Sequence, residues 1–138
     1  MVEKIEKTME NVKGKIIAIL GLAFKSETDD IREAPSMVII EELYQRGAKI
    51  KTFDPQAMEE AKKKLKHLKE IIFCKNEYEA IEGADALVII TEWNQFRRLD
   101  FARIKKMMKD NYIFDLRNIY SKDIIEKETG FKYFSVGR

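Results

Sequence analysis

The sequence predicts an α/β fold, in which a doubly wound, mainly parallel sheet of five or six strands carries helices on both faces. Short apolar runs recur along the chain and alternate with stretches of helical spacing, which is the pattern of parallel strands joined by helices. The runs contain few polar residues, as expected of strands that are buried on both faces. The length of 138 residues is that of a single domain.

The first dozen residues have helical spacing, with Val2, Ile5, Met9 and Val12 near one face. We expect this helix to have little to pack against within the chain. Strands are then expected over residues 15–21, 48–53, 70–73, 86–90, 112–114 and, at the edge, 132–134. Helices are expected over residues 35–46, 54–68, 77–81, 101–109 and 122–128. The sum of these elements is a Rossmann-like domain.

Composition argues against several classes of protein. The net charge is only +2, and the lysines of residues 61–69 are flanked by glutamates, so we expect a solvated helix face and no nucleic-acid partner. The single cysteine, Cys74, allows no internal disulfide and suits a reducing cytosol. No apolar run approaches the ~20 residues of a membrane span, and residues 1–11 resemble no signal peptide. We therefore expect a cytoplasmic protein without a membrane partner.

Polar residues gather in three loops that follow expected strands, over residues 21–32, 91–94 and 115–118. Ligands of open parallel sheets bind beyond the carboxyl ends of the strands, where the strand order reverses. If the first and fourth strands are neighbours, the three loops converge on one crevice. Lys25 and Arg117 suit a phosphate, Phe24 suits a base or sugar, and Arg32 lies just ahead of a helix N-terminus.

The same residues also have plain structural interpretations. Lys25 can be a surface lysine, Arg117 can pair with Asp115, and Arg32 can pair with Asp29 or Asp30. The two adjacent aspartates have no evident third ligand, so no metal is expected.

Three further residues are expected to play structural parts. Trp93 can be a half-buried lid over the core, His67 is expected to be exposed and inert, and Cys74 to be a buried small hydrophobe. Residues 21–25 do not spell the G-x-G-x-x-G dinucleotide fingerprint, and no motif of a hydrolase, zinc protease or nucleotide triphosphatase is present. We expect no catalytic residue in this chain.

Several motifs stand in order along the chain, over residues 21–25, 28–36, 53–55, 84–88, 91–93, 96–97, 115–118 and 135–138. Together they resemble the C-terminal domain of the UDP-glucose/GDP-mannose dehydrogenases, from about Lys13 to the end. Residues 91–93 and 117–118 are most similar to the UDP-glucose branch.

The resemblance implies a division of labour. Enzymes of this family oxidise the sugar C6 alcohol with NAD, which an N-terminal domain holds, while a central domain supplies the catalytic cysteine. The C-terminal domain closes over the nucleotide sugar. By resemblance, Phe24, Lys25 and Arg117 contact UDP-glucose or UDP-glucuronate, and Arg32 reaches the NAD.

The expected organisation is a linker helix over residues 1–13, from a central domain outside this chain, and a UDP-sugar-binding domain over residues 14–138. The expected partners are the N-terminal and central domains, in the same or a separate chain, and the full enzyme is expected to be a homo-oligomer. The chain then represents an excised domain or a split or truncated product.

Other readings stay open. They are a stand-alone UDP-sugar-binding module, an inactive remnant, and the equivalent domain of a GDP-mannose or UDP-N-acetylmannosamine dehydrogenase. Three positions depart from the family pattern. Leu116 replaces a glycine beside Arg117, and Ser26 and Glu27 replace proline and asparagine.

Overall fold

The computed structural model describes residues 2–23, 30–31, 34–121, 125–126 and 130–135. Its strands form one sheet in the order β3-β2-β1-β4-β5-β6, and every neighbouring pair is parallel. The strands are β1 (Ile16–Leu20), β2 (Lys49–Phe53), β3 (Ile72–Phe73), β4 (Ala86–Ile89), β5 (Tyr112–Asp115) and β6 (Lys132–Ser135). The helices are α1 (Val2–Thr8), α2 (Pro35–Gln45), α3 (Met58–Lys64), α4 (Glu77–Ile81), α5 (Asn94–Arg97) and α6 (Phe101–Met107). The predicted α/β fold is confirmed.

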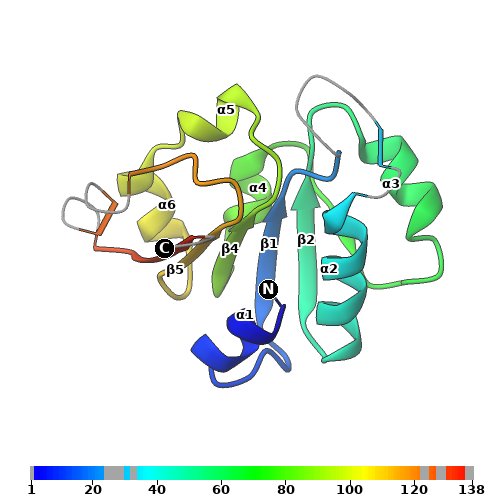
Figure 1. Ribbon diagram of the computed structural model, residues 1–138, viewed down its shortest axis with the longest axis horizontal. Coiled ribbons are helices and arrows are strands. Elements are labelled where there is room, and N and C mark those ends of the chain that lie inside the picture. The colour runs from blue at the N-terminus through cyan, green and yellow to red at the C-terminus, as the bar shows by residue number, and fades with distance from the viewer. Residues whose placement is uncertain (1, 24–29, 32–33, 122–124, 127–129, 136–138) are drawn as a thin grey trace.

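Helices cover both faces of the sheet, and each face has its own apolar core (Figure 1). Ile17 and Ile19 of β1 join one core with side chains of α1, α2 and α3. Ala18 and Leu20 join the other core with side chains of α4, α5 and α6. Successive residues of β1 thus point to opposite faces, and both faces are dry, which is why the run is apolar throughout.

Helix α1 completes the first of these cores. Right-handed crossovers place α2 and α3 on the half of that face that belongs to β1, β2 and β3. Val2, Ile5, Met9 and Val12 are all buried in the same core as strand residues of β4 and β5, and Lys4 Nζ lies 6.0 Å from the ring centroid of Phe134 in β6. The expectation that this helix has little to pack against is therefore wrong, because α1 packs on apolar side chains of β4 and β5.

Several boundaries differ from the prediction. The second expected helix shrinks to α3, because the Asp54 carboxylate accepts the backbone N–H groups of Gln56 and Ala57 and bends the chain before the helix starts. The expected strand over residues 70–73 pairs only at Ile72–Phe73. Helix α5 was not predicted, since four residues are too few to show a period. The expected helix over residues 122–128 lies mostly outside the described residues.

Candidate functional site

The switch point of the sheet lies between β1 and β4. The two strands pair in register, with Leu20 opposite Ile89, and the chain leaves them toward opposite faces. The loops after β1, β4 and β5 therefore meet at the same edge, shown at the top of Figure 1. The Thr91 hydroxyl donates to the carbonyl of Ala23 at 2.7 Å, and Arg117 Nε donates to the carbonyl of Ile90 at 2.8 Å. The described parts of the three predicted loops, over residues 21–23, 91–94 and 115–118, thus lie together, as predicted.

Gly21 is where the first two loops touch. Its φ is +98°, and a Cβ built on it would lie 2.5 Å from both the Cβ and the backbone N of Thr91. Only glycine combines this backbone conformation with so close an approach. The loop that leaves β1 is thereby pressed against the loop that leaves β4.

Asp54, directly after β2, has the most hydrogen-bond donors of any described carboxylate at this edge. It is only 1% exposed, and its two oxygens accept five N–H groups. These are the backbone N–H groups of Leu22 (2.7 Å), Ala23 (3.0 Å), Gln56 (2.8 Å) and Ala57 (2.8 Å), and the indole N–H of Trp93 (3.2 Å). A carboxylate offers about four lone-pair sites, so Asp54 has no acceptor capacity left for a ligand.

This saturation bears on cofactor binding. Dinucleotide-binding Rossmann folds use an acidic residue near the end of the second strand to accept the ribose hydroxyl of NAD. Asp54 stands close to that place but is consumed by the protein, and the fingerprint glycines are absent from residues 21–25. The described residues therefore do not fit NAD bound in the usual Rossmann manner.

Asp115 ends β5 and is also fully buried. Its oxygens accept the backbone N–H groups of Arg117 (2.9 Å), Ile119 (2.8 Å) and Tyr120 (3.2 Å), and the hydroxyl of Tyr133 (2.5 Å). The carboxylate thus fixes the backbone of the following loop, as the side chain of an Asx turn does. That loop carries Arg117.

Arg117 is the predicted site residue that the structure describes. Besides its bond to Ile90, its Nε lies 3.9 Å from a carboxylate oxygen of Glu92, and its side chain is 32% exposed. The guanidinium thus sits between the β4 and β5 loops at the switch point. The other predicted site residues, Phe24, Lys25 and Arg32, lie outside the described residues.

The departure at Leu116 leaves this geometry intact. Among the described non-glycine residues, positive φ occurs at Glu10 and at Asn118 (φ 54°). The left-handed position of the loop is therefore taken by Asn118, a residue that tolerates it. Leu116 donates its N–H to Ile89 at 2.9 Å and packs against the core.

Trp93 lies deeper than a half-buried lid, since it is 5% exposed and bonded to Asp54. Sequence reasoning missed its partner, because the Asp54-Pro55 pair has the pattern of a helix start. The signal that was available is the polar character of Asp54 and Thr91 directly after the predicted strands. Both side chains prove to be buried.

Cys74 is buried, as predicted. Burial raises the pKa of its thiol above the usual value of 9.0, and Glu79 adds to the rise, while Lys51 opposes it. The thiol is protonated at neutral pH and makes a poor nucleophile. Within the described part of the chain, no group of three or more His, Cys, Asp or Glu side chains is placed to hold a metal ion.

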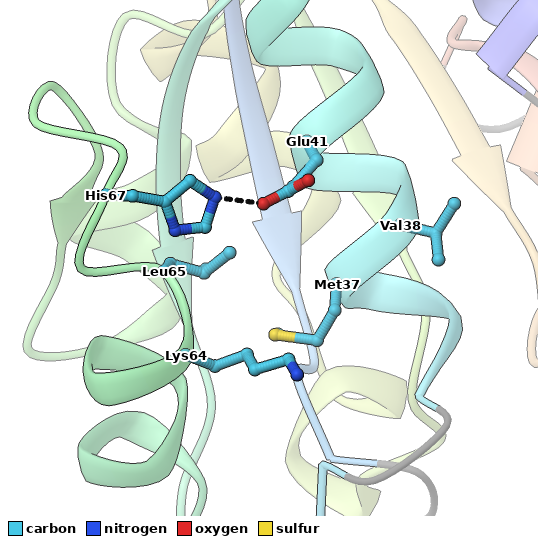
Figure 2. A pocket seen from close by; sticks show the side chains of 6 residues that line it. All are labelled: Met37, Val38, Glu41, Lys64, Leu65 and His67. Atoms are coloured by element: carbon cyan, nitrogen blue, oxygen red, sulfur yellow. Dashed lines mark hydrogen bonds and ion pairs between the residues drawn. The ribbon is translucent and has the colours of Figure 1, made fainter.

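A cavity of about 370 Å³ lies between α2 and the end of α3 (Figure 2). Its lining is Met37, Val38, Glu41, Lys64, Leu65 and His67. His67 is 57% exposed, as predicted, and its Nε2 pairs with Glu41 across the cavity. Residues 61–69 otherwise form the expected solvated face, where exposed lysines pair with Glu59 and Glu60.

The topology and the polar loops that meet at the switch point define a Rossmann-like domain of the kind that holds a ligand beyond its strand ends. None of the helices in the described ranges is long and apolar enough to cross a membrane.

Residues 18–122 match the UDP binding domain of the UDP-glucose/GDP-mannose dehydrogenase family. The chain is 48% identical over 128 residues to a UDP-glucose 6-dehydrogenase of Rhizobium meliloti (strain 1021). The match covers 93% of this chain and 28% of the relative. A UDP-glucose 6-dehydrogenase of Rickettsia typhi is 41% identical over 138 residues, 99% of this chain and 31% of the relative. The chain belongs to the UDP-glucose/GDP-mannose dehydrogenase family and spans about 30% of the length of these relatives.

Solved structures agree with this placement. A UDP-D-ManNAc dehydrogenase from Pyrococcus horikoshii superposes with a TM-score of 0.75 at 27% identity, over 99% of this chain and 29% of that one. A UDP-glucose dehydrogenase from Pyrobaculum islandicum gives a TM-score of 0.68 at 27% identity, over 81% of this chain and 28% of that one. Both matches place this fold as one part of a longer dehydrogenase.

Proposed function

We propose that this chain is the UDP-sugar-binding domain of a UDP-glucose 6-dehydrogenase, which oxidises UDP-glucose to UDP-glucuronate with NAD. The observation that carries the proposal is the position of Arg117 at the switch point, bonded to Ile90 and one-third exposed. A guanidinium there suits a diphosphate, which it can bind with two parallel hydrogen bonds. The relatives named UDP-glucose 6-dehydrogenase support the choice of sugar.

The rest of the site follows from the family resemblance. Phe24 and Lys25 contact the UDP-sugar together with Arg117, and Arg32 reaches toward the NAD. Residues 14–138 form the binding domain, and residues 1–13 are the linker helix, whose apolar side closes the core of this same domain.

The remaining chemistry belongs to other parts of the enzyme. NAD is the hydride acceptor. Because the Asp54 carboxylate has no acceptor capacity left, we propose that another domain makes most of the contacts with NAD. A central domain supplies the catalytic cysteine, since Cys74 is buried and protonated. The whole enzyme is a cytoplasmic homo-oligomer.

The test is calorimetric titration of the chain with UDP-glucose, UDP-glucuronate and GDP-mannose. We expect saturable binding of the two UDP-sugars, weakened about tenfold or more in Arg117→Ala and in Lys25→Ala, the loss expected of charged hydrogen bonds. Arg46→Ala is the matched control, because the Arg46 side chain is also 32% exposed and pairs with Glu6. It lies at the C-terminal end of α2, whereas the N-terminal end of α2 faces the proposed site.

Parent-like affinity in Arg117→Ala would remove that residue from the site. No saturable binding by the parent chain would show that the site forms only together with the other domains. Preference for GDP-mannose would move the chain to another branch of the family.

A further inference from the structure

Two residues of the loop after β1, Leu22 and Ala23, have all their backbone polar groups bound by side chains. Their N–H groups donate to Asp54 at 2.7 and 3.0 Å. Their carbonyls accept the hydroxyls of Ser36 (2.6 Å) and Thr91 (2.7 Å). No strand or helix holds this dipeptide, so three side chains from distant segments fix its path.

The three side chains come from three different elements. Asp54 follows β2, Ser36 lies in the first turn of α2, and Thr91 follows β4. All are buried, where hydrogen bonds are strong and an unpaired polar group is costly. A buried polar network that is fully satisfied specifies one conformation more sharply than apolar packing does.

Trp93 ties a further group into the network. Its indole N–H donates to the same Asp54 oxygen that holds Leu22 and Ala23, while its ring packs in the core on the other face. Glu92, one residue earlier, lies 3.9 Å from Arg117. Residues 91–93 therefore touch both the loop after β1 and the arginine after β5.

We propose that Ser36, Asp54, Thr91 and Trp93 are positioning residues for UDP-sugar binding. They touch no ligand, and they fix Leu22 and Ala23, the two residues that directly precede the proposed ligand-binding residues Phe24 and Lys25 in the sequence. This inference rests on the proposed function and adds the residues that preorganise it. A preformed loop binds more tightly, because less ordering is left to occur on binding.

The test compares two threonines in the chain. Thr91→Ala removes the hydroxyl that holds Ala23, and Thr91→Ser keeps it. Thr52→Ala is the control, because Thr52 is equally buried and donates to the carbonyl of Ile19 at 2.8 Å, within the sheet and away from the loop. Trp93→Phe keeps an aromatic ring and removes the indole N–H.

Two quantities are measured in each variant, namely the Kd for UDP-glucose and the NMR hydrogen-exchange rates of the Leu22 and Ala23 amides without ligand. We expect Thr91→Ala and Trp93→Phe to raise the Kd about three- to tenfold, the effect of one net hydrogen bond, and to speed exchange at both amides. Thr91→Ser restores both quantities. Thr52→Ala lowers the melting temperature but leaves the Kd and the two amides unchanged.

Parent-like exchange at Leu22 and Ala23 in both variants would overturn the proposal, and so would an equal rise of the Kd in Thr52→Ala. If the parent chain does not bind UDP-glucose, the site forms only together with the other domains. Amide exchange then still decides whether these side chains hold the loop.

Discussion

The two halves of the sheet each end in a buried aspartate, and the two aspartates organise their surroundings differently. Asp115 collects backbone N–H groups two, four and five residues further along its own loop, and adds one hydroxyl from β6. Asp54 also binds two nearby N–H groups, but its other donors lie 31, 32 and 39 residues away. The first is mainly a local turn, and the second is a long-range clamp.

The difference separates the two sides of the proposed site. The Arg117 side is shaped by the residues next to it in the sequence. The side that leads to Phe24 and Lys25 is shaped only when β1, β2 and β4 have assembled. A substitution after β2 therefore alters the loop after β1. The conformation of the loop after β5 depends mainly on residues of that loop.

The largest effect that sharpens this contrast comes from removing each carboxylate. We expect Asp54→Ala to lower the free energy of unfolding by about 4 kcal/mol and Asp115→Ala by about 3 kcal/mol. The ranking follows because four of the five hydrogen bonds to Asp54 are buried, whereas two of the four to Asp115 are only partly buried. Urea unfolding measures both values.

Asp100→Ala is the control for losing an aspartate. Asp100 is exposed and caps α6 through one bond to the N–H of Arg103, so its loss costs about 1 kcal/mol. A greater loss for Asp115→Ala than for Asp54→Ala would break the comparison.

A smaller effect tests the close contact on the clamp side. We expect Gly21→Ala to destabilise the chain by about 3 kcal/mol, because left-handed backbone strain adds to a clash with the backbone of Thr91. Gly83 also has a positive φ, at +75°, but a Cβ there meets nothing within 4 Å, so Gly83→Ala costs about 1 kcal/mol. Thermal unfolding of both variants gives the difference, and equal losses would show that the two loops are free to separate.

The smallest effect concerns the Asp115 side at alkaline pH. Burial, with Asp115 and Tyr133 nearby, raises the pKa of Tyr120 well above its usual value of 10.0. The folded chain keeps this proton when the unfolded chain loses it, so the stabilisation is complete below pH 10 and falls as the pH rises further.

Tyr120→Phe should therefore flatten the decline in stability above pH 10, by up to about 1.4 kcal/mol per pH unit. At neutral pH it should cost about 1 kcal/mol, since its hydroxyl bonds the carbonyl of Phe96. The pKa of the Cys74 thiol is also raised, but from a usual value of 9.0. Cys74→Ala should therefore change the pH dependence of stability already from about pH 9, and this difference in pH separates the two groups. An unchanged slope in Tyr120→Phe would contradict the assignment.

What the sequence could predict follows the same division. Local patterns were sufficient for the strands, for the helix start at Pro35 and for the polar loop of Arg117, since each depends on neighbours in the chain. The hydrogen bonds of Asp54 to Leu22 and Trp93 could not be predicted from the sequence, because they depend on which strands become neighbours. The burial of Val2 and Ile5 was missed for the same reason, since the surface they cover exists only in the folded sheet.

Trp93 is the single tryptophan of the chain. Its indole is hydrogen-bonded to the carboxylate that holds the loop leading to Phe24 and Lys25. The tryptophan fluorescence of the protein therefore comes from one buried indole next to the switch point of the sheet, and the five tyrosines form the background. Excitation of the indole reports the state of that loop in real time, without a dye or an added label.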